Sequence, residues 1–282
     1  MSELIDSNGQ PAVQVSAPDG AQATILLQGA HVVSWVPAAS TEQLYLSPKA
    51  VYAPGQAVRG GVPVIFPQFE QRGPDRSLPR HGFARTQTWQ LESKRQGSDH
   101  GQATLTLTDN EATRAIWPHG FTLELTVAVS GAQLDLELFV HNTGTTAWPF
   151  AAALHTYLAV SDLEKVRLQG LQGLHYQDSL RGDEAIEDHA ERRFYGEIDR
   201  IYGQAGNLLL RDGSRQLGIG SANLPDAVLW NPGPDKCATL RDMPADGWRH
   251  MLCVEAARIT QPKTLAPGED WVGRQSLLLQ TP

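Results

Sequence analysis

A histidine and a glutamate interrupt apolar stretches of this sequence and are the first candidates for chemistry. His155 lies in the apolar stretch 153–158, and Glu255 lies in the apolar stretch 253–256. An imidazole titrates near neutral pH and a desolvated carboxyl group has a raised pKa, so the two could move protons on one substrate. The residues alone leave another interpretation open, in which His155 is a satisfied core histidine and Glu255 pairs with an arginine.

Two further segments look unlike plain strands or solvated turns. In one, Arg59 precedes two glycines and an apolar run that contains Pro63 and Pro67. Proline cannot donate to a strand ladder, so this run is unusual for a central strand. In the other, His81 and Arg85 lie close together in the stretch 79–85. These segments could bring imidazole and guanidinium groups to a site.

The elements that must position these residues are predicted to be β-strands. Apolar residues alternate over 121–129 and again over 134–140, with a short Gly-containing break between them, which is typical of a hairpin. Other strands are expected at 12–16, 24–27, 32–36, 104–108, 208–210, 217–219, 227–230, 251–255 and 276–280. One short helix is expected over 109–116, capped by Asp109 or Asn110. The pattern predicts an all-β fold, a large antiparallel β-sandwich with few short helices, as a single domain over residues 1–282.

The composition of the chain argues against several classes of binding partner and cellular location. The chain has 282 residues and a net charge of −8, which argues against nucleic acid or an anionic membrane as the main partner. It has no apolar run of about 18 residues, and its acidic start does not look like a signal peptide. Cys237 and Cys253 cannot make a disulfide framework and are expected to be buried and reduced. We therefore expect a cytoplasmic protein, and nothing demands more than a monomer.

The segments described above, taken in order, resemble the hexose-6-phosphate mutarotases, or glucose-6-phosphate 1-epimerases, of the aldose 1-epimerase family. One such block alone would be weak, but seven blocks in order are specific. The matching blocks are 59–63, 81–85, 154–157, 197–202, 230–232, 242–244 and 253–255, and the resemblance covers about residues 25–280.

The resemblance implies a galactose-mutarotase-like β-sandwich that interconverts the α and β anomers of a hexose 6-phosphate, most simply glucose 6-phosphate. It implies neither a metal nor an organic cofactor. His155 takes the general-acid position and would protonate the ring oxygen as the ring opens. Glu255 takes the general-base position and would remove the proton of the anomeric hydroxyl group.

The same resemblance assigns four substrate-binding residues. His81 would hydrogen-bond near the ring oxygen, Asp199 would bind sugar hydroxyls, and Arg59 with Arg85 would lie on the phosphate side, where guanidinium groups suit bidentate contacts. Each has a structural alternative: a loop histidine, a turn or cap aspartate, or arginines in surface ion pairs. Gln68 departs from the family pattern, because an aromatic residue that could line the sugar site is common there.

Two other functions remain open. A non-catalytic carbohydrate-binding or regulatory protein could use the same fold, although binding alone does not need both His155 and Glu255. An aldose 1-epimerase of unphosphorylated sugars is the other alternative, which Arg59 together with Arg85 disfavours. The expected partner is therefore a small phosphorylated aldose.

Overall fold

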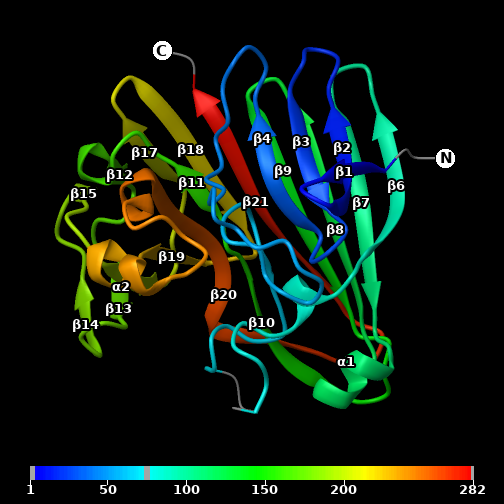
Figure 1. Ribbon diagram of the computed structural model, residues 1–282. Helices are drawn as coiled ribbons and strands as arrows, with labels where there is room; N and C mark the ends of the chain where they lie inside the picture. Colours follow the sequence, from blue (N-terminus) through cyan, green and yellow to red (C-terminus); the bar gives the residue numbers. More distant parts are fainter. Residues whose placement is uncertain (1–3, 73–76, 281–282) are drawn as a thin grey trace.

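The computed structural model describes residues 4–72 and 77–280, and antiparallel strands dominate it (Figure 1). The strands form sheets of four, eight and nine strands. The expected all-β fold with few short helices is confirmed.

The nine-stranded sheet contains the hairpin that alternation predicts. In β8 and β9 every second residue is buried, so each strand turns one apolar face inward. The turn between them lies between the paired residues Ser130 and Gln133. In spatial order the strands are β15 (Glu191–Arg193), β12 (Arg167–Gln169), β17 (Leu208–Asp212), β18 (Arg215–Ala222), β21 (Asp270–Gln280), β9 (Gln133–His141), β8 (Thr122–Ser130), β7 (Gly101–Thr108) and β6 (Gln90–Gln96).

The four-stranded sheet packs on one end of the nine-stranded sheet. Its strands are β1 (Ile5–Ser7), β2 (Gln10–Ser16), β3 (Gln22–Leu26) and β4 (His31–Val36). Strand β2 contacts β6, β7 and β8, and β3 contacts β8. One cluster of buried apolar side chains joins all three sheets, with Ile25, Leu125 and Leu229 as members from each of them.

The eight-stranded sheet carries the candidate site. Its order is β14 (Asp183–Ile186), β13 (His175–Asp178), β16 (Ile198–Tyr202), β19 (Asp226–Asn231), β20 (Met251–Leu265), β10 (Trp148–Leu154) and β5 (Val64–Ile65), and β11 (Tyr157–Ala159) also pairs with β20. Strand β20 is buried without interruption over its first seven residues. Both faces of the sheet are therefore covered there, which explains why the sequence around Glu255 is continuously apolar.

The expected helix is confirmed as α1 (Glu111–Ile116), whose N-cap is Asn110. A second helix, α2 (Gly233–Thr239), was not expected, because its seven residues begin with Gly and Pro and show no helical periodicity. Figure 1 shows the two helices on opposite sides of the molecule. Short 3₁₀ turns cover Ala84–Thr86, Leu163–Lys165 and Gly247–His250. Within residues 4–72 and 77–280, no helix has the length and apolar character needed to cross a membrane.

Candidate active site

The two candidate proton-transfer residues are cross-strand neighbours in the eight-stranded sheet. Leu154 ends β10, Tyr157 begins β11, and both pair with β20 in one unshifted register, so His155 lies opposite Glu255. The His155 Nδ1 and Glu255 Oε1 atoms are 3.2 Å apart. The expectation that His155 lies inside a strand is wrong, because it occupies the break between β10 and β11.

Strand alternation turns Glu255 away from the main core. Its neighbour Val254 belongs to the core cluster between the sheets, whereas Val228, opposite Glu255 on β19, belongs to a smaller cluster on the other face. Glu255 and His155 line a cleft of about 190 Å³ on that face. Among the described residues, the buried His155 Nδ1 and Glu255 Oε2 atoms have no hydrogen-bond partner. Unpaired buried polar atoms are costly, so a ligand in the cleft is the natural partner for them.

Burial and neighbouring charges shift both pKa values toward each other. Burial raises the pKa of Glu255 well above its usual value, and the charges of Asp199 and Glu70 raise it further. Burial lowers the pKa of His155, and so do His81, Arg85 and Arg59. Both shifts favour the uncharged form of the group concerned, the carboxylic acid of Glu255 and the neutral imidazole of His155.

The ring of His155 is held by a chain of aromatic and polar contacts. The Tyr157 ring stacks on it, with centroids 4.8 Å apart and planes 11° from parallel. Arg59 donates through Nη1 to the Tyr157 hydroxyl at 3.1 Å and pairs through Nε with Asp242 at 3.1 Å. Arg59 thus lines the cleft and also makes an ion pair with a carboxylate, which was its structural alternative.

His81 presents a fixed donor to the cleft. The backbone amide of Glu70 donates to its Nδ1 at 3.2 Å, so the neutral ring carries its hydrogen on Nε2. Burial lowers the pKa of His81 to about 3, helped by Arg85, Arg80 and Arg59, so the ring stays neutral at physiological pH. Its centroid lies 5.7 Å from that of His155. The two imidazoles therefore share one site.

Gln68 does not line the cleft, which corrects the expectation that its replacement of an aromatic residue bears on sugar binding. It is 2% exposed and donates through Nε2 to the carbonyl groups of Leu78 and Pro79. These bonds brace the segment that leads to His81. The Gln68 side chain therefore stabilises this loop, because its amide group donates to two carbonyl groups that lie outside the strand ladders.

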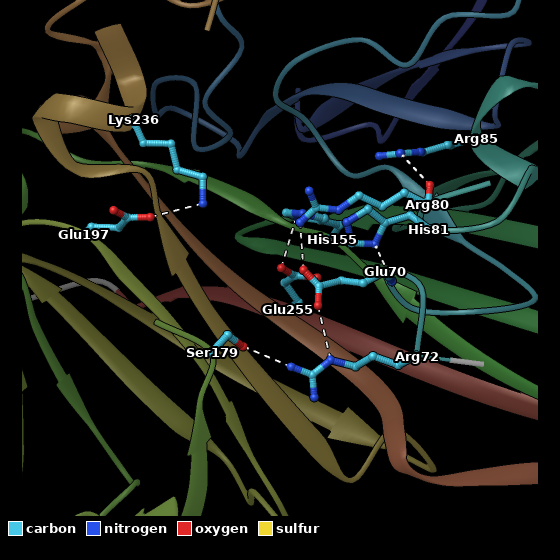
Figure 2. A network of polar contacts seen from close by, with 10 residues as sticks. All are labelled: Glu70, Arg72, Arg80, His81, Arg85, His155, Ser179, Glu197, Lys236 and Glu255. Atoms are coloured by element: carbon cyan, nitrogen blue, oxygen red, sulfur yellow. Dashed lines mark hydrogen bonds and ion pairs between the residues drawn. The ribbon is translucent and has the colours of Figure 1, made fainter. Parts of the chain in front are cut away.

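Basic side chains gather along one side of the cleft. The cleft is lined by Arg59, Arg80, Arg85 and Lys236. Figure 2 shows Arg80 bonded to Glu70 and Lys236 bonded to Glu197, at 2.7 Å and 3.1 Å. These cations favour an anionic ligand.

Arg85 differs from the other three in that no described carboxylate forms an ion pair with it. It donates through Nη2 to the Arg80 carbonyl at 3.0 Å, and no described residue accepts a hydrogen bond from its buried Nε. Burial lowers its pKa, as do the charges of Arg59 and Arg80. A guanidinium group with a free donor beside other cations is suited to a doubly charged oxyanion.

Asp199 lies in β16 opposite Trp230 of β19, so it is neither a turn nor a helix-cap residue. It lines the cleft together with Trp230. Burial raises its pKa, and the charge of Glu70 raises it further. The cleft therefore has a cationic side and a carboxylate side.

Sequence reasoning missed three charged residues that line this cleft in the described structure, Glu70, Arg80 and Lys236. Glu70 and Arg80 adjoin segments that the sequence singled out, so proximity along the chain was a usable signal. Lys236 lies on α2, the helix that the sequence did not predict, and no local pattern pointed to it. The six residues that the sequence proposed all lie in the cleft.

Other candidate groups lie outside the cleft. Both cysteines are buried and free, as expected. Within the described chain, Glu187, Asp188 and His189 could together hold a metal ion, although spacing along the sequence did not suggest it. The Glu187 carboxylate, however, already accepts from Tyr202 and lies 3.6 Å from an Arg192 nitrogen, so cationic and donor groups compete for it.

The fold and the cleft together define a β-sandwich protein whose cleft holds a buried histidine–glutamate pair and is lined by four cationic side chains of the described residues. The chain belongs to the aldose 1-epimerase family, whose model matches residues 11–278. This membership confirms the resemblance that the sequence motifs indicated.

Curated relatives cover most of the chain. A protein of Cenchrus ciliaris named "Putative glucose-6-phosphate 1-epimerase" is 36% identical over 267 residues, covering 90% of this chain and 80% of its own. A protein of Escherichia coli K12 with the same name is 37% identical over 242 residues, covering 84% and 79%.

Solved structures agree with the sandwich architecture. YeaD of Salmonella typhimurium, described as a putative mutarotase, superposes with a TM-score of 0.91 at 30% identity over 99% of this chain and 93% of its own. Slr1438 of Synechocystis sp. PCC 6803, at 20% identity, shares the fold with a TM-score of 0.83 over 100% and 99% of the two chains.

Proposed function

We propose that this protein interconverts the α and β anomers of a hexose 6-phosphate, with glucose 6-phosphate as the first substrate. The names of the curated relatives support this substrate. The observation that carries the proposal is the joint presence, in one cleft, of the His155–Glu255 pair and the Arg59–Arg85 side. The first can open a hemiacetal, and the second can hold a phosphate group.

The reaction needs two proton transfers and no covalent intermediate. The Glu255 carboxylate takes the proton of the anomeric hydroxyl group while protonated His155 gives a proton to the ring oxygen, and the bond between C1 and that oxygen breaks. The open-chain aldehyde then rotates about its C1–C2 bond. Ring closure on the other face returns the proton of Glu255 to the C1 oxygen, while His155 takes back the proton of the attacking hydroxyl group, so atoms and charges balance over the cycle.

The shifted pKa values suit the two proton transfers. Burial raises the pKa of Glu255 and lowers that of His155, so ionised Glu255 is a stronger base and protonated His155 a stronger acid than in water. Each positioned acid or base contributes about 10²–10⁴-fold, which suits a reaction that already proceeds in water.

The other cleft residues take binding roles in this proposal. The Nε2–H group of His81 would donate to the ring oxygen or to the open-chain carbonyl. Asp199 would accept from sugar hydroxyls on the carboxylate side, and Arg59 and Arg85 would bind the phosphate. All these groups come from one chain, so we propose a monomer that works without a metal or organic cofactor.

The decisive experiment measures α/β exchange of glucose 6-phosphate by NMR saturation transfer. We expect the protein to accelerate exchange, and both Glu255→Gln and His155→Ala to reduce the catalysed rate at least about 100-fold, because each removes one proton-transfer group. His175→Ala is the matched control, since His175 is exposed and outside the cleft. A folded variant of either catalytic residue with the wild-type rate would contradict the assignment.

Replacing Arg85 tests the phosphate side. We expect Arg85→Ala to raise the KM for glucose 6-phosphate by at least about tenfold while changing exchange of glucose little, because only the phosphorylated sugar loses a charge-assisted bond. Arg114→Ala, which removes an exposed arginine of α1, controls for the change in net charge. Equal losses on both sugars would favour an epimerase of unphosphorylated aldoses, and no exchange of any aldose would favour a binding protein.

A further inference from the structure

A buried glutamine lies beneath the strand break that carries His155. Gln275 is in β21 of the nine-stranded sheet, on the inward row that also contains Trp271 and Leu277. Its side chain is 0% exposed, although its row neighbours are apolar. A buried amide among apolar side chains is unfavourable unless it is hydrogen-bonded, so its partners reveal its role.

The partners of Gln275 are the residues directly beside the two proton-transfer groups. Its Oε1 accepts from the Thr156 hydroxyl group, and its Nε2 donates to the Val254 carbonyl at 3.1 Å. Thr156 follows His155, and Val254 precedes Glu255. One side chain from the opposite sheet therefore bonds both segments that carry the pair.

Gln275 also replaces a missing bond of the strand ladder. Thr156 lies opposite Val254 in the register, and the Val254 amide donates to the Thr156 carbonyl at 3.1 Å. A regular antiparallel pair would return a bond from the Thr156 amide, but that amide donates to the Leu154 carbonyl at 2.9 Å. The Val254 carbonyl is thus left without its ladder donor, and the amide group of Gln275 supplies one.

We propose that Gln275 is a positioning residue that holds His155 and Glu255 in register across the strand break. The proposal rests on the proposed function for its kinetic readout. The break lets the His155 ring turn into the cleft, but it also removes the regular ladder that would fix the backbone there. The amide of Gln275 fixes the backbone from the side of the nine-stranded sheet. It does not occupy the cleft, because alternation turns Thr156 toward that sheet and away from the cleft.

The test replaces Gln275 by a side chain of similar size without hydrogen bonds. We expect Gln275→Met to lower kcat for anomer exchange by about 10- to 100-fold, with KM for glucose 6-phosphate changed less than about threefold, because a small displacement of reacting groups affects chemistry more than binding. Asn142→Leu is the matched control. Asn142 is also fully buried and its amide also bonds two carbonyl groups, those of Thr146 and Leu265, but it lies outside the cleft.

Thr156 supplies a conservative rescue. Thr156→Val removes the hydroxyl group and should lower kcat like Gln275→Met, whereas Thr156→Ser keeps the hydroxyl group and should retain most of it. The double variant Thr156→Val/Gln275→Met should be little worse than Gln275→Met alone, because both changes break one network. Unchanged kcat in Gln275→Met, or an equal loss in Asn142→Leu, overturns the proposal.

A spectroscopic measurement separates this proposal from the proposed function. If the wild-type protein catalyses no exchange, the proposed function fails, and the imidazole ¹H–¹⁵N signals of His155 still report its position. Gln275→Met should shift these signals and Asn142→Leu should not. Unshifted signals in Gln275→Met would overturn the positioning role whatever the activity of the wild-type protein.

Discussion

Neighbouring charges shift the pKa values of Glu255 and His155 in opposite directions. Glu255 has carboxylates for neighbours, since Asp199 and Glu70 both raise its pKa beyond the effect of burial. His155 instead faces His81, Arg85 and Arg59, which lower its pKa beyond the effect of burial. Asp199 and Glu70 thus act on Glu255, whereas Arg85 acts on both members of the pair, because its charge also opposes the rise in the pKa of Glu255.

We therefore expect Asp199 to tune the pH dependence of the proposed reaction. A neighbouring negative charge makes protonation of Glu255 easier, so its removal should lower the pKa of Glu255. Activity requires the carboxylate form, and we expect Asp199→Asn to move the acidic limb of the kcat/KM profile to lower pH. The profile would be measured by NMR exchange between pH 4 and pH 8. Asp183→Asn, at an exposed position, should leave the limb in place, and an unmoved limb in Asp199→Asn would refute the coupling.

Among the elements, the described segments 66–72 and 77–85, which lead to His81 and Arg85, have a demanding backbone. Glu70, His81 and Gly82 all have positive φ angles, of 51°, 66° and 67°. At Gly82 the chain passes so close to Phe66 that an added Cβ would lie 1.9 Å from the Phe66 carbonyl oxygen. Only glycine fits there, and this close approach holds the neighbouring His81 against the sheet.

Substitution of Gly82 should therefore unfold or displace this loop. We expect Gly82→Ala to lower the free energy of unfolding by at least about 2 kcal/mol, because backbone strain and a backbone clash add. Gly55→Ala is the matched control: its φ is also positive, at 73°, but nothing lies within 4 Å of the added Cβ, so it should cost about 1 kcal/mol. Urea unfolding measures both variants, and equal losses would show that the contact with Phe66 does not matter.

Across the whole molecule, the three sheets share one core. Trp35 from β4, Trp148 from β10 and Trp271 from β21 are buried in the same apolar cluster. Separating any one sheet from the other two would expose this apolar surface to water, which is unfavourable. We propose on this ground that the chain is a single domain.

A single domain should unfold in one step. We expect far-ultraviolet circular dichroism, which reports the strands, and tryptophan fluorescence, which reports the shared core, to give the same urea midpoint and the same m value. Glucose 6-phosphate should raise the midpoint of both signals together, since it binds only the folded state. Two separate midpoints would contradict the single-domain proposal.

Much of the architecture was readable from local sequence. Alternation predicted the β8–β9 hairpin and most long strands, and a cap residue followed by a few helical residues predicted α1, because both signals lie within a few neighbouring positions. Shorter elements such as β12, β15 and α2 have too few residues for a period to appear. Residue type likewise singled out His155 and Glu255, since a polar group in an apolar stretch stands out without any knowledge of the fold.

The sequence by itself determined the strands, the family and the residue types of the site. Only the tertiary structure decided that His155 lies opposite Glu255, that Gln68 is a loop brace, and that Gln275 joins the pair from another sheet. The physical reason is that pairing register and side-chain contacts between sheets join residues far apart in the chain, and no local pattern encodes them. Net charge shows the same limit, because an overall −8 argues against anionic polymers as partners, yet the folded chain still gathers arginines at one cleft.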